Sequence, residues 1–184
     1  MKIIVIVFLL LSIFTAFAVP TFYDAYTEHR VLKASRQIAE DLIRVRRYSI
    51  QSNKDYGVMF VKDKLHGYYI FLDNNSNGVF DYGDTSIESV NLKNINKHIK
   101  FSNTLDDKGV VFRNNTVVFN GSGKIQADET GHDSIFIVNE RDERKGITDR
   151  IIRIYVDRAT NDIRILRVTD KTDSGDLVFG DIRS

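Results

Sequence analysis

The chain has 184 residues, and its charges nearly cancel, with 26 Lys and Arg against 25 Asp and Glu. This length suits a single domain, and the charge balance creates no overall field that would attract nucleic acid or anionic lipid. The sequence contains no cysteine. Disulfide bonds, thiolate metal sites and a cysteine nucleophile are therefore excluded.

The first element is an apolar segment without a charged side chain, which extends from residue 3 to residue 23. A helix of roughly 17–25 apolar residues crosses the hydrocarbon core of a bilayer, and lipid forces such a segment to be helical. We therefore predict a transmembrane helix over residues 1–23. Lys2 precedes it, whereas Asp24 and Glu28 follow it. The positive-inside rule then leaves the N-terminus in the cytoplasm and places the rest of the chain outside it.

A second, amphipathic helical pattern follows directly over residues 24–52. Small and apolar side chains recur every three or four positions, which is typical of a helix face that packs on a domain. The residues of this stripe are Val31, Ala34, Ile38, Leu42, Val45 and Ser49. The only proline, Pro20, lies where the two patterns meet, and a proline inside a helix removes one backbone hydrogen bond. We expect one long helix with a bend near Pro20.

An alternative interpretation of the apolar segment is a secretory signal peptide. Lys2, an apolar core and Ala16-Phe17-Ala18 resemble a signal with a small-x-small cleavage site. Cleavage after Ala18 would release an exported ligand-binding or enzymatic β domain. We favour a retained anchor, because the segment is longer than the usual core of about 7–15 residues and helical periodicity resumes directly beyond the site.

Beyond residue 53 the period changes to two, and short β-branched and aromatic segments predict strands. The expected strands are residues 57–61, 67–72, 86–91, 98–101, 110–113, 116–119, 124–127, 134–138, 150–157 and 162–168. Asn114 and Asn115 tolerate positive φ and predict a tight hairpin between their flanking strands. Residues 169–184 are polar and are expected to form a flexible tail. The pattern predicts an α+β fold, with an antiparallel β globular domain of residues 53–168 packed on the helix stripe.

One loop has the residue spacing of a calcium site. Oxygen-bearing groups recur at alternate positions, and a glycine allows the turn, as in an EF-hand loop. The predicted ligands are Asp73, Asn75, Asn77, the carbonyl of Val79, Asp81 and Asp84. Asp84 takes the position of the bidentate glutamate, and no flanking helices are predicted. The alternative is that Asn and Asp side chains form Asx-turns in a long hairpin loop.

Bases are concentrated in the C-terminal hairpin and its flanks. They are Arg150, Arg153, Arg158, Arg164, Arg167 and Lys171. As a nucleic-acid-binding module this hairpin would contact phosphates, and its affinity for DNA would fall steeply with salt. Acidic residues alternate with these bases, so ion pairs across the strands are the favoured interpretation. Nothing pairs a catalytic base with a nucleophile, and we predict that the protein is not an enzyme.

In chain order, these features resemble the GspH/FimT-type minor pseudopilins. The resemblance starts from an apolar helix with one proline at its exit, followed by the Arg-rich segment Asp41-Leu-Ile-Arg-Val-Arg-Arg-Tyr-Ser-Ile-Gln51. It continues with Gly67-Tyr-Tyr-Ile-Phe-Leu-Asp-Asn-Asn-Ser-Asn-Gly-Val-Phe-Asp-Tyr-Gly-Asp84, the turn Val118-Phe119-Asn120-Gly121-Ser122-Gly123 and the closing hairpin. Together these features cover most of the chain as far as residue 168.

The resemblance implies a structural subunit of a type II secretion pseudopilus or a type IV pilus. Its helix would anchor it in the inner membrane and then join other pilin or pseudopilin subunits and the assembly platform, with the globular domain outside. Such proteins begin with a basic leader and Gly-Phe-Thr-Leu-Ile-Glu, whose glutamate neutralises a neighbour's terminal amine within lipid. That glutamate would fall near Ile3, but no Glu precedes Glu28. We favour a reading frame that extends upstream of Met1, and the alternatives are a divergent tip subunit or a helix that serves only as an anchor.

Overall fold

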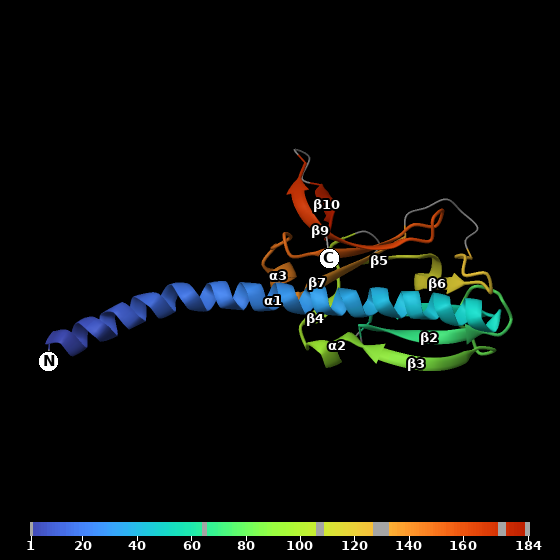
Figure 1. The fold of residues 1–184 in the computed structure, drawn as a ribbon, viewed down its shortest axis with the longest axis horizontal. Helices are drawn as coiled ribbons and strands as arrows, with labels where there is room; N and C mark the ends of the chain where they lie inside the picture. Colours follow the sequence, from blue (N-terminus) through green and yellow to red (C-terminus); the bar gives the residue numbers. More distant parts are fainter. Residues whose placement is uncertain (1, 64–65, 106–108, 127–132, 173–175, 183–184) are drawn as a thin grey trace.

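One long helix lies against two antiparallel sheets in the computed structural model, which describes residues 2–63, 66–105, 109–126, 133–172 and 176–182. Helix α1 (Lys2–Ser52) has 51 residues and continues through position 20 without a break. Its N-terminal part projects beyond the globular domain, whereas its C-terminal part lies along the sheets (Figure 1). We call residues 2–23 the projecting half of α1 and residues 24–52 the docked half.

The strands form a four-stranded sheet of order β3-β2-β1-β6 and a six-stranded sheet of order β10-β9-β8-β7-β4, in which β5 also pairs with β7. The first sheet contains β1 (Asp55–Val61), β2 (Gly67–Asp73), β3 (Thr85–Asn91) and β6 (Thr116–Phe119). The second contains β4 (Ile99–Phe101), β5 (Val110–Val111), β7 (Asp133–Asn139), β8 (Ile152–Val156), β9 (Ile163–Lys171) and β10 (Leu177–Asp181). Two short helices, α2 (Leu92–Ile95) and α3 (Glu140–Arg144), and the 3-10 turn η2 (Arg113–Asn115) complete the described elements.

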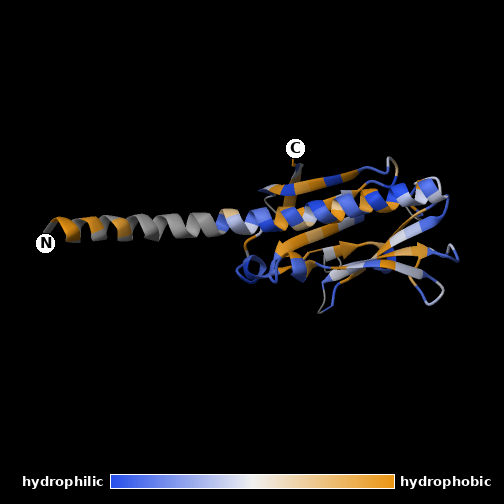
Figure 2. Cartoon of the chain, turned by 60° about the horizontal axis from the view of Figure 1, so that its bottom comes forward, coloured by the Kyte–Doolittle hydropathy of each residue, from blue (hydrophilic) through white to orange (hydrophobic). Residues whose placement is uncertain are grey.

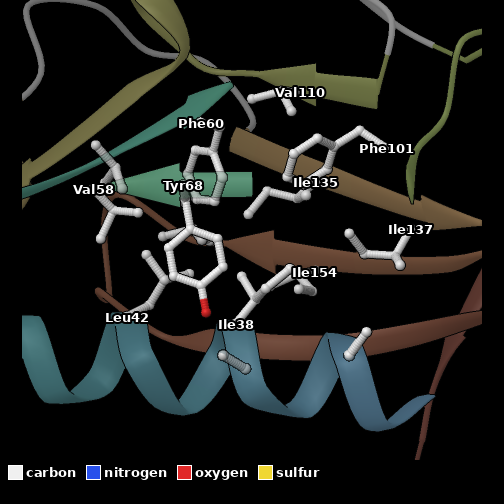
Figure 3. Packing of buried hydrophobic residues seen from close by; sticks show 14 of the residues in the cluster. Ile38, Leu42, Val58, Phe60, Tyr68, Phe101, Val110, Ile135, Ile137 and Ile154 are labelled. Carbon is white, nitrogen blue, oxygen red and sulfur yellow. The ribbon is translucent and has the colours of Figure 1, made fainter. Parts of the chain in front are cut away.

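The main core lies where the docked half of α1 meets both sheets. All six residues of the predicted stripe are buried, with exposed fractions of 0–1%. Figure 3 shows Ile38 and Leu42 facing Tyr68 of β2 and Ile154 of β8, so one helix face closes both sheets. Full burial of a Leu or Ile side chain contributes about 1.5–3 kcal/mol, which makes this stripe a main source of stability.

Strand β7 is buried on both faces. Ile135 and Ile137 point into the main core, whereas Phe136 and Val138 belong to a second apolar cluster on the other face. This follows from the period of two in a strand, which sends successive side chains to opposite faces. Phe179 of β10 packs on the second cluster, with ring centroids 5.7 Å from Phe136. The edge strand β10 therefore contributes an apolar side chain to the outer face of the sheet to which it belongs.

The hairpin predicted at Asn114-Asn115 is wrong, although both residues do adopt positive φ, of 54° and 55°. Strand β5 pairs with β7, and β6 pairs with β1, so the turn η2 carries the chain from one sheet to the other. Local turn residues set the direction of the backbone, but the partner of each strand depends on which apolar face it must bury.

Two other assignments at the sequence level need correction. The flexible tail expected from residue 169 is instead the end of β9 and the strand β10, which pair in antiparallel register. Backbone pairing tolerates polar side chains at a sheet edge, and Phe179 supplies the apolar contact that fixes the strand. The strand expected over residues 124–127 is reduced to an isolated bridge between Phe119 and Ile125, and residue 127 lies outside the described residues.

Candidate functional surfaces

The projecting half of α1 exposes apolar side chains. Ile3, Ile4, Val7 and Leu11 are 77%, 60%, 48% and 56% exposed, and the domain first buries a described helix residue at Thr27. Figure 2 shows the apolar N-terminal end of the helix and the mixed surface of its docked half. Contiguous exposed apolar surface is typical of a face that binds another apolar partner. Within the described residues, no helical stretch has the length and hydropathy required to span a membrane.

Polar contacts fix the docked half of α1 to the four-stranded sheet. The Asp41 carboxylate accepts hydrogen bonds from the Tyr68 hydroxyl of β2 and, at 2.8 Å, from the Arg44 guanidinium. Arg44 also reaches Glu88 of β3 at 2.8 Å. Burial and the neighbouring Asp41 both raise the pKa of Tyr68, so this hydroxyl keeps its proton and acts as a donor. The network holds one helix position against two strands.

Arg46 connects the end of α1 to two distant turns. Its Nε donates to the carbonyl of Gly123 and its Nη1 donates to the carbonyl of Asn161, each at 3.0 Å. Gly123 belongs to the turn after β6, and Asn161 belongs to the turn between β8 and β9. One guanidinium therefore joins the helix to both sheets.

Ion pairs fix α1 where it leaves the domain. Arg150, just before β8, lies 3.1 Å from Asp24 and 3.4 Å from the buried Asp142. Arg167 of β9 pairs with Glu28 one helical turn further along. Burial raises the pKa of Asp142, and the nearby Arg150 opposes that shift. These contacts hold the first turns of the docked half against the six-stranded sheet.

The loop between β2 and β3 brings the predicted calcium ligands together but occupies their oxygens with hydrogen bonds. Asp73, which is 3% exposed, accepts from the backbone N–H groups of Asn77 and Gly78 at 3.3 and 2.8 Å. Asp81 accepts from Gly83 N at 2.8 Å and from the side-chain amides of Asn75 and Asn77. The N–H of Gly83 and then these two amides lower the pKa of Asp81.

The other ligand positions of this loop follow the same pattern. Asp84 accepts from the N–H groups of Asn74 and Asp81 at 3.0 and 2.9 Å, and the Asn77 side chain accepts from Val79 N at 2.8 Å. The contacts from Gly83 N to Asp81 and from Val79 N to Asn77 are Asx-turns, the alternative that the sequence left open. Among the described residues, no three or more His, Asp and Glu side chains are grouped so as to hold a metal ion. The calcium site stays a prediction.

The bases proposed for DNA contact are distributed over several elements, and most of them already bind acidic groups. Besides the pairs of Arg150 and Arg167, the Arg158 guanidinium holds the buried Asp133 through two nitrogens, at 2.5 and 2.6 Å. Arg164 lies 3.3 Å from Asp162. Arg153 stacks between the rings of Phe136, Tyr155 and Phe179, with its Cζ 5.2–5.6 Å from their centroids. Lys171 is exposed near the end of β9.

Two solved structures resemble this arrangement. The type IV minor pilin FimU from Pseudomonas aeruginosa is 14% identical, with a TM-score of 0.50 over 83% of this chain and 96% of FimU. The minor pseudopilin EpsH from the type 2 secretion system of Vibrio cholerae is 12% identical, with a TM-score of 0.49 over 75% of this chain and 97% of EpsH. No family model and no curated protein sequence matches this chain. The chain has the fold of a minor pilin.

The minor-pilin fold confirms the predicted α+β architecture, a long N-terminal helix on antiparallel sheet. The contacts of two arginines give the Arg-rich segment at the end of α1 a structural role. Arg44 and Arg46 of this segment fix the helix to strands and turns that lie far away in sequence. Sequence reasoning missed these contacts, since neither charge nor spacing shows which backbone carbonyls an arginine will reach. Their position beside the buried stripe was the only available signal.

Proposed function

We propose that this protein is a membrane-anchored minor subunit of a type II secretion pseudopilus or a type IV pilus. The observation that carries the proposal is the exposed apolar surface of the projecting half of α1, attached to a minor-pilin fold. The structures that share this fold are named as a minor pilin and a minor pseudopilin, which supports a structural role rather than an enzymatic one.

In this proposal, the two halves of α1 have different roles. Residues 1–23 hold the subunit in the inner membrane with a single span and later pack against the helices of other pilin or pseudopilin subunits. The docked half fixes the globular domain relative to this anchor, because the apolar stripe and the arginines of the docked half contact both sheets. The globular domain then lies outside the cytoplasm, where it meets neighbouring subunits.

Cysteine cross-linking tests this proposal, because the chain has no cysteine of its own. Leu11→Cys places a thiol on the exposed face of the projecting half, and Tyr82→Cys places one at a fully exposed position in the loop of residues 73–84. We expect the protein in the membrane fraction and a thiol cross-link between Leu11→Cys and a matching cysteine in another subunit's N-terminal helix. The Tyr82→Cys control should not give this product.

The signal-peptide alternative predicts a different result. Cleavage after Ala18 would remove residue 11 and give a soluble exported protein with Val19 at its N-terminus. N-terminal sequencing of the native protein separates the two. A mature chain that starts at Val19 and stays out of the membrane fraction would contradict the subunit role.

A further inference from the structure

Two segments, residues 92–98 and 140–149, form the end of the domain from which α1 projects (Figure 1). They adjoin through β4 and β7, where the N–H of Glu140 donates to the carbonyl of His98 at 2.7 Å. The first segment contacts α1 directly, since Arg30 donates to the carbonyl of Ile95 at 3.0 Å. Arg150, which follows the second segment, pairs with Asp24 of α1. In the proposed function, this end therefore faces the bilayer that holds the projecting half of the helix.

Two of the acids in these segments point inward. Asp142 is 5% exposed and lies 3.4 Å from Arg150. The Glu143 side chain is 8% exposed and lies 2.5 Å from Lys100 Nζ. Lys100 compensates the charge of Glu143, whereas Arg150 is shared between Asp142 and the more exposed Asp24.

The bases in the same segments point outward. The exposed bases are Lys93, Lys97, Arg141, Arg144 and Lys145, which together we call the basic end. Two less buried acids lie among them, Glu140 and Asp149, and Glu140 pairs with Arg144 at 3.0 Å. A sequence with balanced charge is therefore folded so that one end presents an excess of positive charge to solvent.

We propose that the basic end docks on a membrane surface that contains anionic lipid. Bases close to such a surface are attracted to it, and the attraction falls off within a Debye length of about 8–10 Å. The inference rests on the proposed function, because the projecting half of α1 must hold the domain at the same membrane. The docked domain would keep the ion pairs of Asp24 and Glu28 closed and would be released when the subunit leaves the bilayer for a filament.

The test uses the full chain reconstituted in two kinds of vesicle, phosphatidylcholine alone and phosphatidylcholine with phosphatidylglycerol. A fluorophore on Asn94→Cys, an exposed position of α2, reports the distance to a quencher on the lipid headgroups. We expect stronger quenching in the anionic vesicles and loss of the difference in high salt. Combining Arg144→Gln with Lys145→Gln should lower the ratio of docked to undocked domain roughly thirtyfold.

The matched control combines Arg47→Gln with Lys54→Gln, which removes the same charge from exposed positions at the other end of α1. It should leave the quenching unchanged. Co-flotation with the vesicles measures membrane association. If the chain co-floats with both kinds of vesicle but the quenching does not depend on lipid charge, the docking proposal is overturned, whereas the proposed membrane anchor is retained. Equal losses in the control and in the basic-end variant would also overturn it, since location would not matter. A chain that floats with neither kind of vesicle contradicts docking and anchoring together.

Discussion

The Glu143 carboxylate is held by a cation, a hydroxyl and a backbone N–H. Lys100, Ser102 Oγ and the backbone N–H of Asn103 lie 2.5, 2.8 and 2.7 Å from its oxygens. Burial alone would raise its pKa, but these donors outweigh burial and hold the pKa of Glu143 below its ordinary value. A carboxylate with a lowered pKa stabilises the fold above the ordinary pKa, and that contribution is lost as the pH falls through the folded value.

We expect Glu143→Gln to lower the free energy of unfolding by about 1.5–3 kcal/mol at pH 7, because hydrogen bonds to a charged group are lost. The difference from the native protein should shrink as the pH falls below the ordinary glutamate pKa of about 4.3. Urea unfolding at neutral and acid pH measures both. Glu140→Gln is the control, since its surface pair with Arg144 is worth at most about 1 kcal/mol. A Glu143→Gln deficit that did not depend on pH would contradict the electrostatic account.

Asp73 fixes the start of the predicted calcium loop by accepting backbone hydrogen bonds from Asn77 and Gly78. Asp73→Ala should cost about 1–3 kcal/mol in the presence of a chelator, because the N–H groups of Asn77 and Gly78 lose their charged acceptor. Thermal melting of both proteins checks this. Millimolar calcium then tests the cation site separately. If calcium binds there, it should raise the melting temperature of the native protein but not that of Asp81→Asn. An unchanged melting temperature of the native protein would rule out the calcium site.

At the scale of the element, the docked half of α1 offers a matched pair of substitutions in adjacent residues. Leu42 is fully buried between the two sheets, whereas its neighbour Ile43 is 39% exposed. Leu42→Ala removes methyl groups from a closed core and should destabilise the protein by about 2–5 kcal/mol.

Ile43→Ala should cost about 1 kcal/mol or less, because little apolar surface leaves a buried environment. Equilibrium unfolding in urea compares the two variants under the same conditions. Similar losses at both positions would mean that the stripe does not carry the contact between helix and sheets.

The same element shows why the helix was predictable and some strand partners were not. The spacing of Val31, Ile38 and Val45 already identifies the buried face, because a helix repeats every 3.6 residues whatever it packs against. A strand pattern identifies which side chains are buried but not which strand lies beside them. The turn at Asn114-Asn115 was therefore found, whereas its role as a crossing between sheets was not.

The candidate surfaces divide in the same way. The apolar projecting half of α1 and the loop of residues 73–84 could be predicted, since composition and local spacing define them. The partners of the C-terminal bases could not be predicted. Arg158 binds Asp133 from a strand 25 residues earlier, and Arg153 contacts aromatic rings of three strands. Sequence neighbours such as Asp157 instead cap their own turn, through hydrogen bonds from the N–H groups of Ala159 and Thr160.

At the scale of the whole molecule, α1 is the element that joins the two sheets. The stripe packs on strands of both sheets, and the ends of the docked half are fixed by polar contacts. Asp24 and Glu28 bind arginines of the six-stranded sheet at the entrance of the helix. Arg46, near its other end, binds one turn from each sheet. A force on the projecting half would therefore be transmitted to both sheets rather than to one.

Arg46→Gln should weaken this joint without disturbing the apolar stripe. A glutamine is shorter and uncharged, so neither Gly123 O nor Asn161 O keeps its charged donor, and hydrogen bonds of this kind contribute about 1.5–3 kcal/mol. Amide hydrogen exchange should then show faster opening in the turns of residues 120–124 and 158–161. Arg47→Gln, an exposed neighbour, should change stability by no more than about 0.5 kcal/mol. Unchanged exchange at both turns in Arg46→Gln would show that the apolar stripe alone holds the sheets together.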